Sequence, residues 1–227
     1  MALGSLVSIA ASTFNRVMVV ELSLLQIIPG LLLALHYFIQ ISRPNWGFLS
    51  DKGGNRTFWI IIGVIILCLG SVLACIGILL IPENYLFGLT ISIFAYTLIG
   101  IGVGASGTSL LAFLATRTDN SKKAAAATIT WIMMIFGAAF TAIFVGKIID
   151  PYSIEKLLKI VTIISLFWII TSFITLYKLE NTHKQKVLDR FEPVSVTFYQ
   201  GLKQVLLEQN TRWFAIFVFL SMTAYFM

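Results

Sequence analysis

Polar side chains that could bind a ligand or move a proton occur within, or directly beside, the first two apolar stretches of the chain. They are Asn15, Arg16, Glu21, Gln26, His36 and Gln40. Polar groups within a membrane are costly to desolvate, and they are functional-site hypotheses by default. We therefore predict that Asn15, Arg16, His36 and Gln40 contact a ligand.

His36 and Gln40 are four residues apart, so they share one face of a helix. A lone imidazole within a membrane could ligate the magnesium of a chlorin, relay a proton, or form a hydrogen bond to another helix. The residues leave these three roles open. Arg16 and Glu21 could pair with each other or extend to the membrane surface.

The composition excludes an ordinary soluble domain. Hydrophobic residues make up 58% of the 227 positions, charged residues make up 11%, and the mean hydropathy is +0.92. Soluble domains carry about 25% charged residues. Six apolar stretches approach or exceed the roughly 20 residues that span a bilayer. They cover residues 2–20, 24–41, 58–81, 86–115, 124–145 and 158–177. The sequence thus predicts an all-α polytopic membrane protein.

A seventh apolar stretch begins at Trp213 and reaches Met227. It would be about 22 Å long as a helix, which is short for a membrane crossing, so we expect the chain to be a fragment. The predicted domains are a six-helix bundle at 1–178, a cytoplasmic linker at 179–211 and a truncated seventh helix at 212–227. Within the linker, helical spacing predicts an amphipathic surface helix carrying Phe198, Leu202, Val205 and Leu206.

The distribution of basic residues predicts the orientation. Most of the 16 Lys and Arg residues lie after the second, fourth and sixth stretches. The positive-inside rule therefore places these connections and the N-terminus in the cytoplasm. Membrane orientation thus explains the excess of basic over acidic residues in the chain, and we expect no nucleic-acid partner.

Residues 47–56 form the most specific local motif, Gly-Phe-Leu-Ser-Asp-Lys-Gly-Gly-Asn-Arg. It resembles motif A of the major facilitator superfamily, with matches at Gly47, Asp51, Gly54 and Arg56. Glycines permit a tight turn and close helix approach. Asp51 could accept hydrogen bonds from a helix N-terminus, and Arg56 could pair with an acidic group. The resemblance implies a six-helix half-bundle of that superfamily, in which these contacts bias the inward-open and outward-open states.

Residues 100–107 contain the glycine spacing of a dinucleotide-binding loop, but no strand precedes them. Gly100 and Gly104 instead predict a small-residue face for close helix packing. The sequence offers no nucleophile–base arrangement, no metal-ligand cluster and no phosphate loop, so we predict no catalytic or metal-binding residues and no enzyme activity.

Four segments together resemble the BCH/PucC family of light-harvesting-complex assembly proteins. They are residues 12–22, 43–51, 102–111 and the region from 124 through 153. The resemblance implies a twelve-helix protein of a bacterial inner, intracytoplasmic or thylakoid membrane. Such a protein would deliver or handle (bacterio)chlorophyll or nascent antenna polypeptides, with antenna polypeptides, chlorophyll-synthesis proteins and the lipid bilayer as partners and with chlorophyll or bacteriochlorophyll as a bound pigment.

Two other functions remain as alternatives. Motif A favours a small-molecule transporter that works by alternating access. An enzyme of tetrapyrrole synthesis is disfavoured, because prenyl transfer would need Asp-rich motifs that bind magnesium diphosphate, and the sequence has none.

Overall fold

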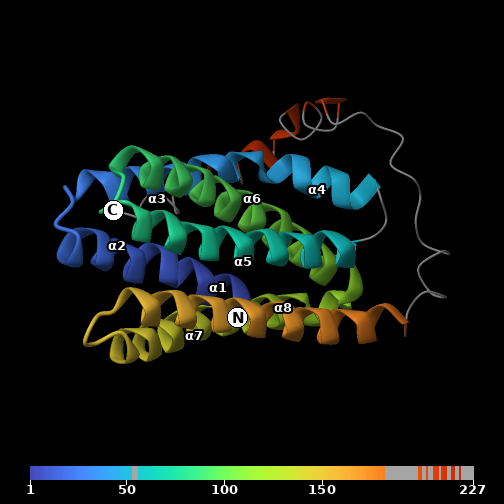
Figure 1. Ribbon diagram of the computed structural model, residues 1–227. Coiled ribbons are helices and arrows are strands. Elements are labelled where there is room, and N and C mark those ends of the chain that lie inside the picture. Colours follow the sequence, from blue (N-terminus) through green and yellow to red (C-terminus); the bar gives the residue numbers. More distant parts are fainter. Residues whose placement is uncertain are drawn as a thin grey trace. The chain divides into compact units, whose positions relative to one another are not determined.

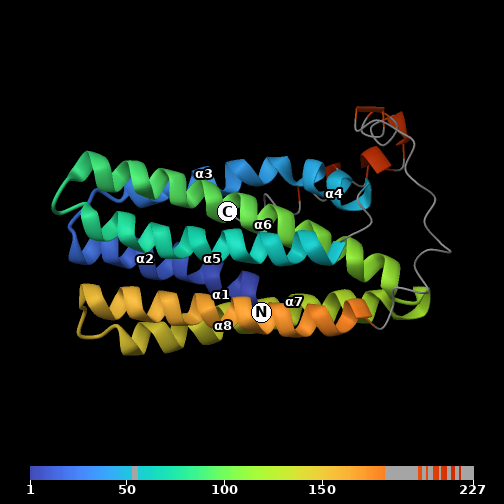
Figure 2. The ribbon, with the colours of Figure 1, turned by 45° about the vertical axis from the view of Figure 1, so that its right-hand side comes forward.

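The computed structural model describes residues 1–52 and 56–181 and scattered positions between 199 and 220, with side chains described as far as residue 176 in the second range. The chain divides into two compact units, Met1–Phe191 and Glu192–Met227. Every regular element in the described part of the first unit is a helix (Figures 1 and 2). Five of these helices are long and apolar enough to cross a membrane: Ala2–Glu21, Arg56–Leu80, Tyr85–Arg117, Asn120–Ile148 and Ile154–Leu176. The prediction of an all-α polytopic membrane protein is confirmed.

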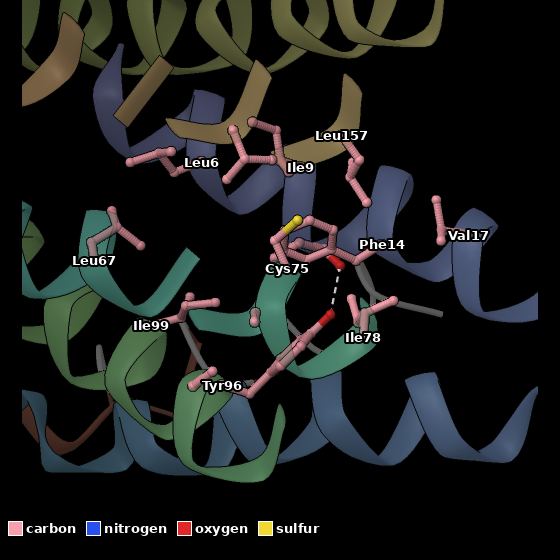
Figure 3. Packing of buried hydrophobic residues seen from close by; sticks show 14 of the residues in the cluster. Leu6, Ile9, Phe14, Val17, Leu67, Cys75, Ile78, Tyr96, Ile99 and Leu157 are labelled. Atoms are coloured by element: carbon pink, nitrogen blue, oxygen red, sulfur yellow. Dashed lines mark hydrogen bonds between the residues drawn. The ribbon is translucent and has the colours of Figure 1, made fainter. Parts of the chain in front are cut away.

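The first of these helices, which we call helix 1, alternates between two helical forms. It comprises α1 (Ala2–Ser8), a π-helical segment η1 (Ile9–Thr13), α2 (Phe14–Arg16) and a second π-helical segment η2 (Val17–Glu21). A π turn contains one residue more than an α turn and changes which residue each carbonyl bonds. The Phe14 N–H bonds the Ile9 carbonyl, and the Ala10 carbonyl accepts the Tyr96 hydroxyl at 3.0 Å (Figure 3).

The second predicted stretch, 24–41, is not a single membrane-length α-helix. It comprises α3 (Ile27–Ile39), a 3-10 turn η3 (Gln40–Ser42) and then α4 (Arg43–Lys52). Pro44 lacks the N–H that would bond the Gln40 carbonyl in an α-helix, and that carbonyl accepts the Arg43 N–H instead. The 13 residues of α3 span only about 20 Å. The six predicted spans are therefore five in the described structure, with the second replaced by α3, η3 and α4 in series.

The next two helices, α5 (Arg56–Leu80) and α6 (Tyr85–Arg117), pack with their backbones in contact. Gly63, Gly70 and Gly77 recur every seven residues on α5 and face α6. A Cβ atom on Gly63 would lie 2.5 Å from the Ser106 nitrogen, and one on Gly77 would lie 2.8 Å from the Ser92 nitrogen. Small residues thus let these helices approach more closely than larger side chains allow.

Gly100 and Gly104 lie on another side of α6, where α3 and α4 pack. A Cβ on Gly100 would be 2.8 Å from the His36 carbonyl oxygen, and one on Gly104 would be 3.4 Å from the Trp46 ring. The prediction of a packing face at these two glycines is confirmed.

The last two helices of the first unit, α7 (Lys123–Ile148, after a 3-10 turn η4 at Asn120–Lys122) and α8 (Ile154–Asn181), expose most of their apolar side chains. Phe136, Phe140 and Phe144 stack along α7 with ring centroids 6.1 and 5.9 Å apart, each at least half exposed. Helix 1 covers the inner side of α7, where the Ser5 and Thr141 hydroxyls lie 2.7 Å apart. Exposed apolar helices of this length are suited to a lipid environment.

The core lies between helix 1, α5, α6 and α8. Figure 3 shows large members of this core pointing toward its interior, among them Leu6, Ile9, Phe14, Val17, Leu67, Ile78, Tyr96, Ile99 and Leu157. Each of these side chains is at most 1% exposed. One face of helix 1 is thereby fixed against the bundle.

The second unit is described only at isolated positions. The Arg212 N–H bonds the Glu208 carbonyl at 3.0 Å, and the Thr211 hydroxyl bonds the Glu208 carboxylate at 2.9 Å. The predicted amphipathic helix with Phe198, Leu202, Val205 and Leu206 lies outside the described residues. The predicted boundaries at 178 and 211 stay predictions.

Candidate functional site

Arg56 joins the ends of three helices at the motif that resembles motif A. Its guanidinium donates to the Asp51 carboxylate at 2.6 Å and to the Ala112 carbonyl at 2.7 Å, and it also bonds the Thr116 hydroxyl. The Arg56 side chain is 12% exposed and that of Asp51 is 40% exposed. We call Asp51, Arg56, Ala112 and Thr116 the Arg56 cluster. It ties the end of α4 and the start of α5 to the last turns of α6.

The other motif residues have different positions. Gly47 faces α6, where an added Cβ would be 3.2 Å from Thr108 Cγ2. Gly54 lies outside the described residues. Arg56 does pair with an acidic group, and that group is Asp51 itself, which we had expected to accept from a helix N-terminus. The proposed role of the motif in conformational change stays a prediction.

A second polar group runs along α3 and η3. Gln40 Nε2 lies 2.8 Å from His36 Nε2, and Gln40 Oε1 accepts a hydrogen bond from the Arg43 guanidinium. Because a guanidinium can only donate, the amide oxygen must face Arg43 and the amide nitrogen must donate to His36. His36 is then neutral with its proton on Nδ1. We call Arg43, Gln40 and His36 the polar chain.

The surroundings of His36 favour the hydrogen-bonding role. Its side chain is 1% exposed, its Nε2 is occupied by Gln40, and its buried Nδ1 has no partner among the described residues. A chlorin magnesium could bind the imidazole only if Gln40 left Nε2 or if the residues that bury Nδ1 moved away. The hypothesis that His36 ligates a pigment stays a prediction and requires such a movement.

Replacing Gln40 with Leu is expected to destabilise the protein by about 1–3 kcal/mol, because the His36 ring loses its one hydrogen-bond partner in a buried site. Gln26→Leu is the matched control, since Gln26 is exposed and its side chain caps no helix. Thermal unfolding of the full-length protein in detergent measures both. Equal unfolding midpoints for the two variants would contradict the role of the polar chain.

The remaining predicted contacts, Asn15 and Arg16, lie apart from the polar chain. Both are exposed on helix 1, whereas the neighbouring Phe14 and Val17 are buried. Arg16 forms no ion pair with Glu21, which is also exposed. The structure thus brings His36 and Gln40 together, and Asp51 and Arg56 together, and records no hydrogen bond between either pair and Asn15 or Arg16.

Two residues that form hydrogen bonds in the structure, Arg43 of the polar chain and Tyr96 of the core, were missed in the sequence. Arg43 was counted only as a basic residue of a connection, although its position three after Gln40 places it on the same helix face. Tyr96 gave no signal, because its acceptor is a backbone carbonyl 86 residues away, that of Ala10 in the π-helical segment η1. In the part of the chain that the structure describes, no three His, Cys, Asp or Glu residues gather as a metal site.

Comparison with known proteins decides the family. The model of the PUCC protein family matches residues 13–227. This chain belongs to the PUCC protein family. The resemblance noted in the sequence is confirmed, and together with the five apolar helices it makes the chain part of an integral membrane protein.

Three curated relatives extend the comparison beyond the PUCC family model. The "Bacteriochlorophyll synthase 44.5 kDa chain" of Rhodobacter capsulatus (strain ATCC BAA-309) is 48% identical over 227 residues, which are 100% of this chain and 52% of that protein. "Protein PucC" of Cereibacter sphaeroides is 25% identical over 79% of this chain and 42% of its own length. "Protein PucC" of Rhodobacter capsulatus is 23% identical over 81% and 42%. The chain therefore spans about half the length of these relatives, and no solved structure matches it.

Proposed function

We propose that the protein containing this chain is a membrane assembly factor of photosynthetic light-harvesting complexes that handles (bacterio)chlorophyll or nascent antenna polypeptides. The observation that carries the proposal is the 48% identity, over the whole chain, to a protein named for bacteriochlorophyll synthesis, within a family named for PucC. The proposed location is a bacterial inner, intracytoplasmic or thylakoid membrane with the N-terminus in the cytoplasm.

A non-enzymatic role is part of the proposal. The relative's name refers to a synthase, yet prenyl transfer to a pigment needs carboxylates that hold magnesium diphosphate, and this sequence has no Asp-rich motif. The polar groups of its helices are instead arranged as hydrogen bonds between neighbouring segments, as in the Arg56 cluster and the polar chain. Polar groups in such hydrogen bonds hold the helices in place and are not arranged for catalysis. Binding of a pigment or a polypeptide is therefore the activity that we propose.

The exposed faces of α7 and α8 support contact with lipid or with antenna polypeptides, which are themselves apolar in a membrane. These faces carry Ile129, Ile132, Phe136, Phe140, Ile143 and Phe144 on α7 and Ile163, Leu166, Phe167, Ile170 and Ile174 on α8. Aromatic side chains offer a large contact area with few rotatable bonds.

A small-molecule transporter working by alternating access is the second candidate. The Arg56 cluster favours it, because one cation holds the ends of three helices that would have to separate when the bundle changes state. Substrate-dependent flux in proteoliposomes of full-length protein would support this candidate.

The test of the proposed function is gentle purification of the full-length protein from membranes of its phototrophic host. We expect (bacterio)chlorophyll or antenna polypeptides to copurify, and a deletion strain to accumulate fewer antenna complexes while still synthesising pigment. A preparation without pigment and without antenna polypeptides would contradict the proposal. Loss of pigment synthesis itself in the deletion strain would favour an enzyme instead.

A further inference from the structure

Helix 1 changes its packing partners at the π-helical segment η1. The segment before it, α1, packs against α7, where the buried Ser5 and Thr141 hydroxyls lie 2.7 Å apart. The segment after it lies in the core, where Phe14, Val17 and Met18 are at most 1% exposed. The π turn therefore sets the position of α1 relative to a part of the helix that is fixed in the core.

The Tyr96 hydroxyl bonds the π turn itself. In an α-helix the Phe14 N–H would bond the carbonyl of Ala10, four residues earlier, but here it bonds that of Ile9. The Ala10 carbonyl accepts the Tyr96 hydroxyl at 3.0 Å (Figure 3). Tyr96 is 1% exposed, so this bond forms in a buried site. A hydrogen bond contributes most where a buried acceptor would otherwise lack a donor, and this bond therefore favours the π form of η1 over the α form.

The contact of α1 with α7 fits only one register of helix 1. The extra residue of a π turn changes the register of the neighbouring segment by one residue, or about 100° around the helix axis. If η1 became α-helical while the core part stayed in place, each residue of α1 would take the place of the residue before it. Ser5 would then stand where Gly4 now stands, and a Cβ atom there would overlap the Met134 carbonyl oxygen. Because this oxygen belongs to the backbone of α7, α1 would have to move away.

We propose that Tyr96 controls a register switch in helix 1. The Tyr96–Ala10 hydrogen bond holds η1 in the π form, in which α1 packs on α7. Loss of the bond favours the α form, in which α1 separates from α7 while the core part of the helix stays in place. Tyr96 thereby acts on a contact that lies beyond η1. The hydrogen bond and the hydroxyl pair of Ser5 and Thr141 are both buried within the first unit, and the proposal does not depend on the proposed function.

The experiment measures how often α1 leaves α7 in the full-length protein in detergent. Ser5→Cys places a thiol in the contact, and its labelling by N-ethylmaleimide requires the contact to open, because Ser5 is 1% exposed. When opening and closing are fast relative to labelling, the labelling rate is proportional to the open population. Tyr96→Phe is expected to raise this rate about tenfold, the effect of one buried hydrogen bond. Tyr85→Phe on the same helix is the control and should leave the rate unchanged, since Tyr85 is 45% exposed.

The native thiol of Cys68 distinguishes opening at α1 from loosening of the whole bundle. Cys68 lies on α5, is 1% exposed, and has its Sγ 3.5 Å from the Ser165 carbonyl oxygen on α8. Its labelling rate should stay the same in Tyr96→Phe. Equal increases at Cys68 and at the Ser5→Cys thiol would mean that Tyr96 only stabilises the bundle, which overturns the proposal. An unchanged labelling rate at the Ser5→Cys thiol would overturn it as well.

Deletion of Ala11 tests the register directly. The deletion removes the extra residue of η1, so the Ile9 carbonyl and the Phe14 N–H become α-helical partners and α1 keeps its position on α7. In this background Tyr96→Phe should no longer raise labelling of the Ser5→Cys thiol, because no π turn is left for the hydroxyl to hold. If Tyr96→Phe raises labelling equally with and without Ala11, or if the deletion variant does not fold, the proposal is wrong.

Discussion

Replacing Gly102 with Ala is expected to reduce the free energy of unfolding by on the order of 3 kcal/mol. Gly102 lies on α6, where the helix touches α5. The added Cβ would lie 2.5 Å from the Leu67 nitrogen and 2.7 Å from the Gly63 carbonyl oxygen. Both are backbone atoms, so no side-chain rotation relieves the overlap, and the two helices must move apart.

Moving α5 and α6 apart at Gly102 would affect their whole interface, because other glycines along it bring the two backbones equally close. A Cβ on Gly70 would be 2.9 Å from the Ile99 nitrogen, and one on Gly88 would be 2.6 Å from the Ile81 nitrogen. The core members on α5 and α6 would then lose contact with each other. We therefore expect a lower yield of folded protein as well as a lower unfolding midpoint.

Gly146→Ala is the matched control for this prediction. Gly146 lies within α7 with no atom within 4 Å of an added Cβ. Alanine favours a helix over glycine by up to about 1 kcal/mol, so this variant should be as stable as the wild type or slightly more stable. Thermal or denaturant unfolding of the full-length proteins in detergent measures both. Equal stability of the two variants would show that the helices are less closely packed than described.

Membrane-length helices were predictable from the sequence, because a long run of apolar residues can be recognised without knowing which other segments pack against it. The second stretch was not, since the apolar run 24–41 is long enough to cross, whereas α3 begins only at Ile27 and gives way to a 3-10 turn at Gln40, whose carbonyl has no N–H from Pro44 to accept. The π turns of helix 1 were less accessible still. Their register depends on which side chains reach the core from α5, α6 and α8, and no residue type marks a π turn in the sequence.

In the candidate site too, contacts between residues close in sequence were easier to predict than contacts between distant ones. The four-residue spacing of His36 and Gln40 already placed those two side chains together. Arg56 was expected to pair with an acidic group, but the sequence did not identify Asp51 as that group. The contacts of Arg56 with Ala112 and Thr116 cross more than 50 residues and depend on how α5 and α6 pack.

Replacing Arg56 with Gln is expected to cost about 2–4 kcal/mol, because a largely buried cation with three partners is lost and the Ala112 carbonyl keeps no donor from it. Asp51→Asn should cost less, since Asp51 is 40% exposed and water can replace its partner. The double variant tests the pair directly. If Arg56 and Asp51 act together, the two costs will not add, and the coupling energy should be about 1–2 kcal/mol.

Lys159→Gln provides the comparison for Arg56→Gln, because Lys159 forms an ion pair with Glu155 at 3.5 Å in which both side chains are more than 70% exposed. Such pairs contribute about 0–1 kcal/mol, so this variant should unfold close to the wild type. Burial distinguishes the two cations: Arg56 cannot be rehydrated without separating α4 and α5 from the end of α6. Full-length variants whose unfolding midpoints fall equally would contradict this reasoning. A large loss at Arg56 alone would establish the Arg56 cluster as the contact that holds these helix ends together.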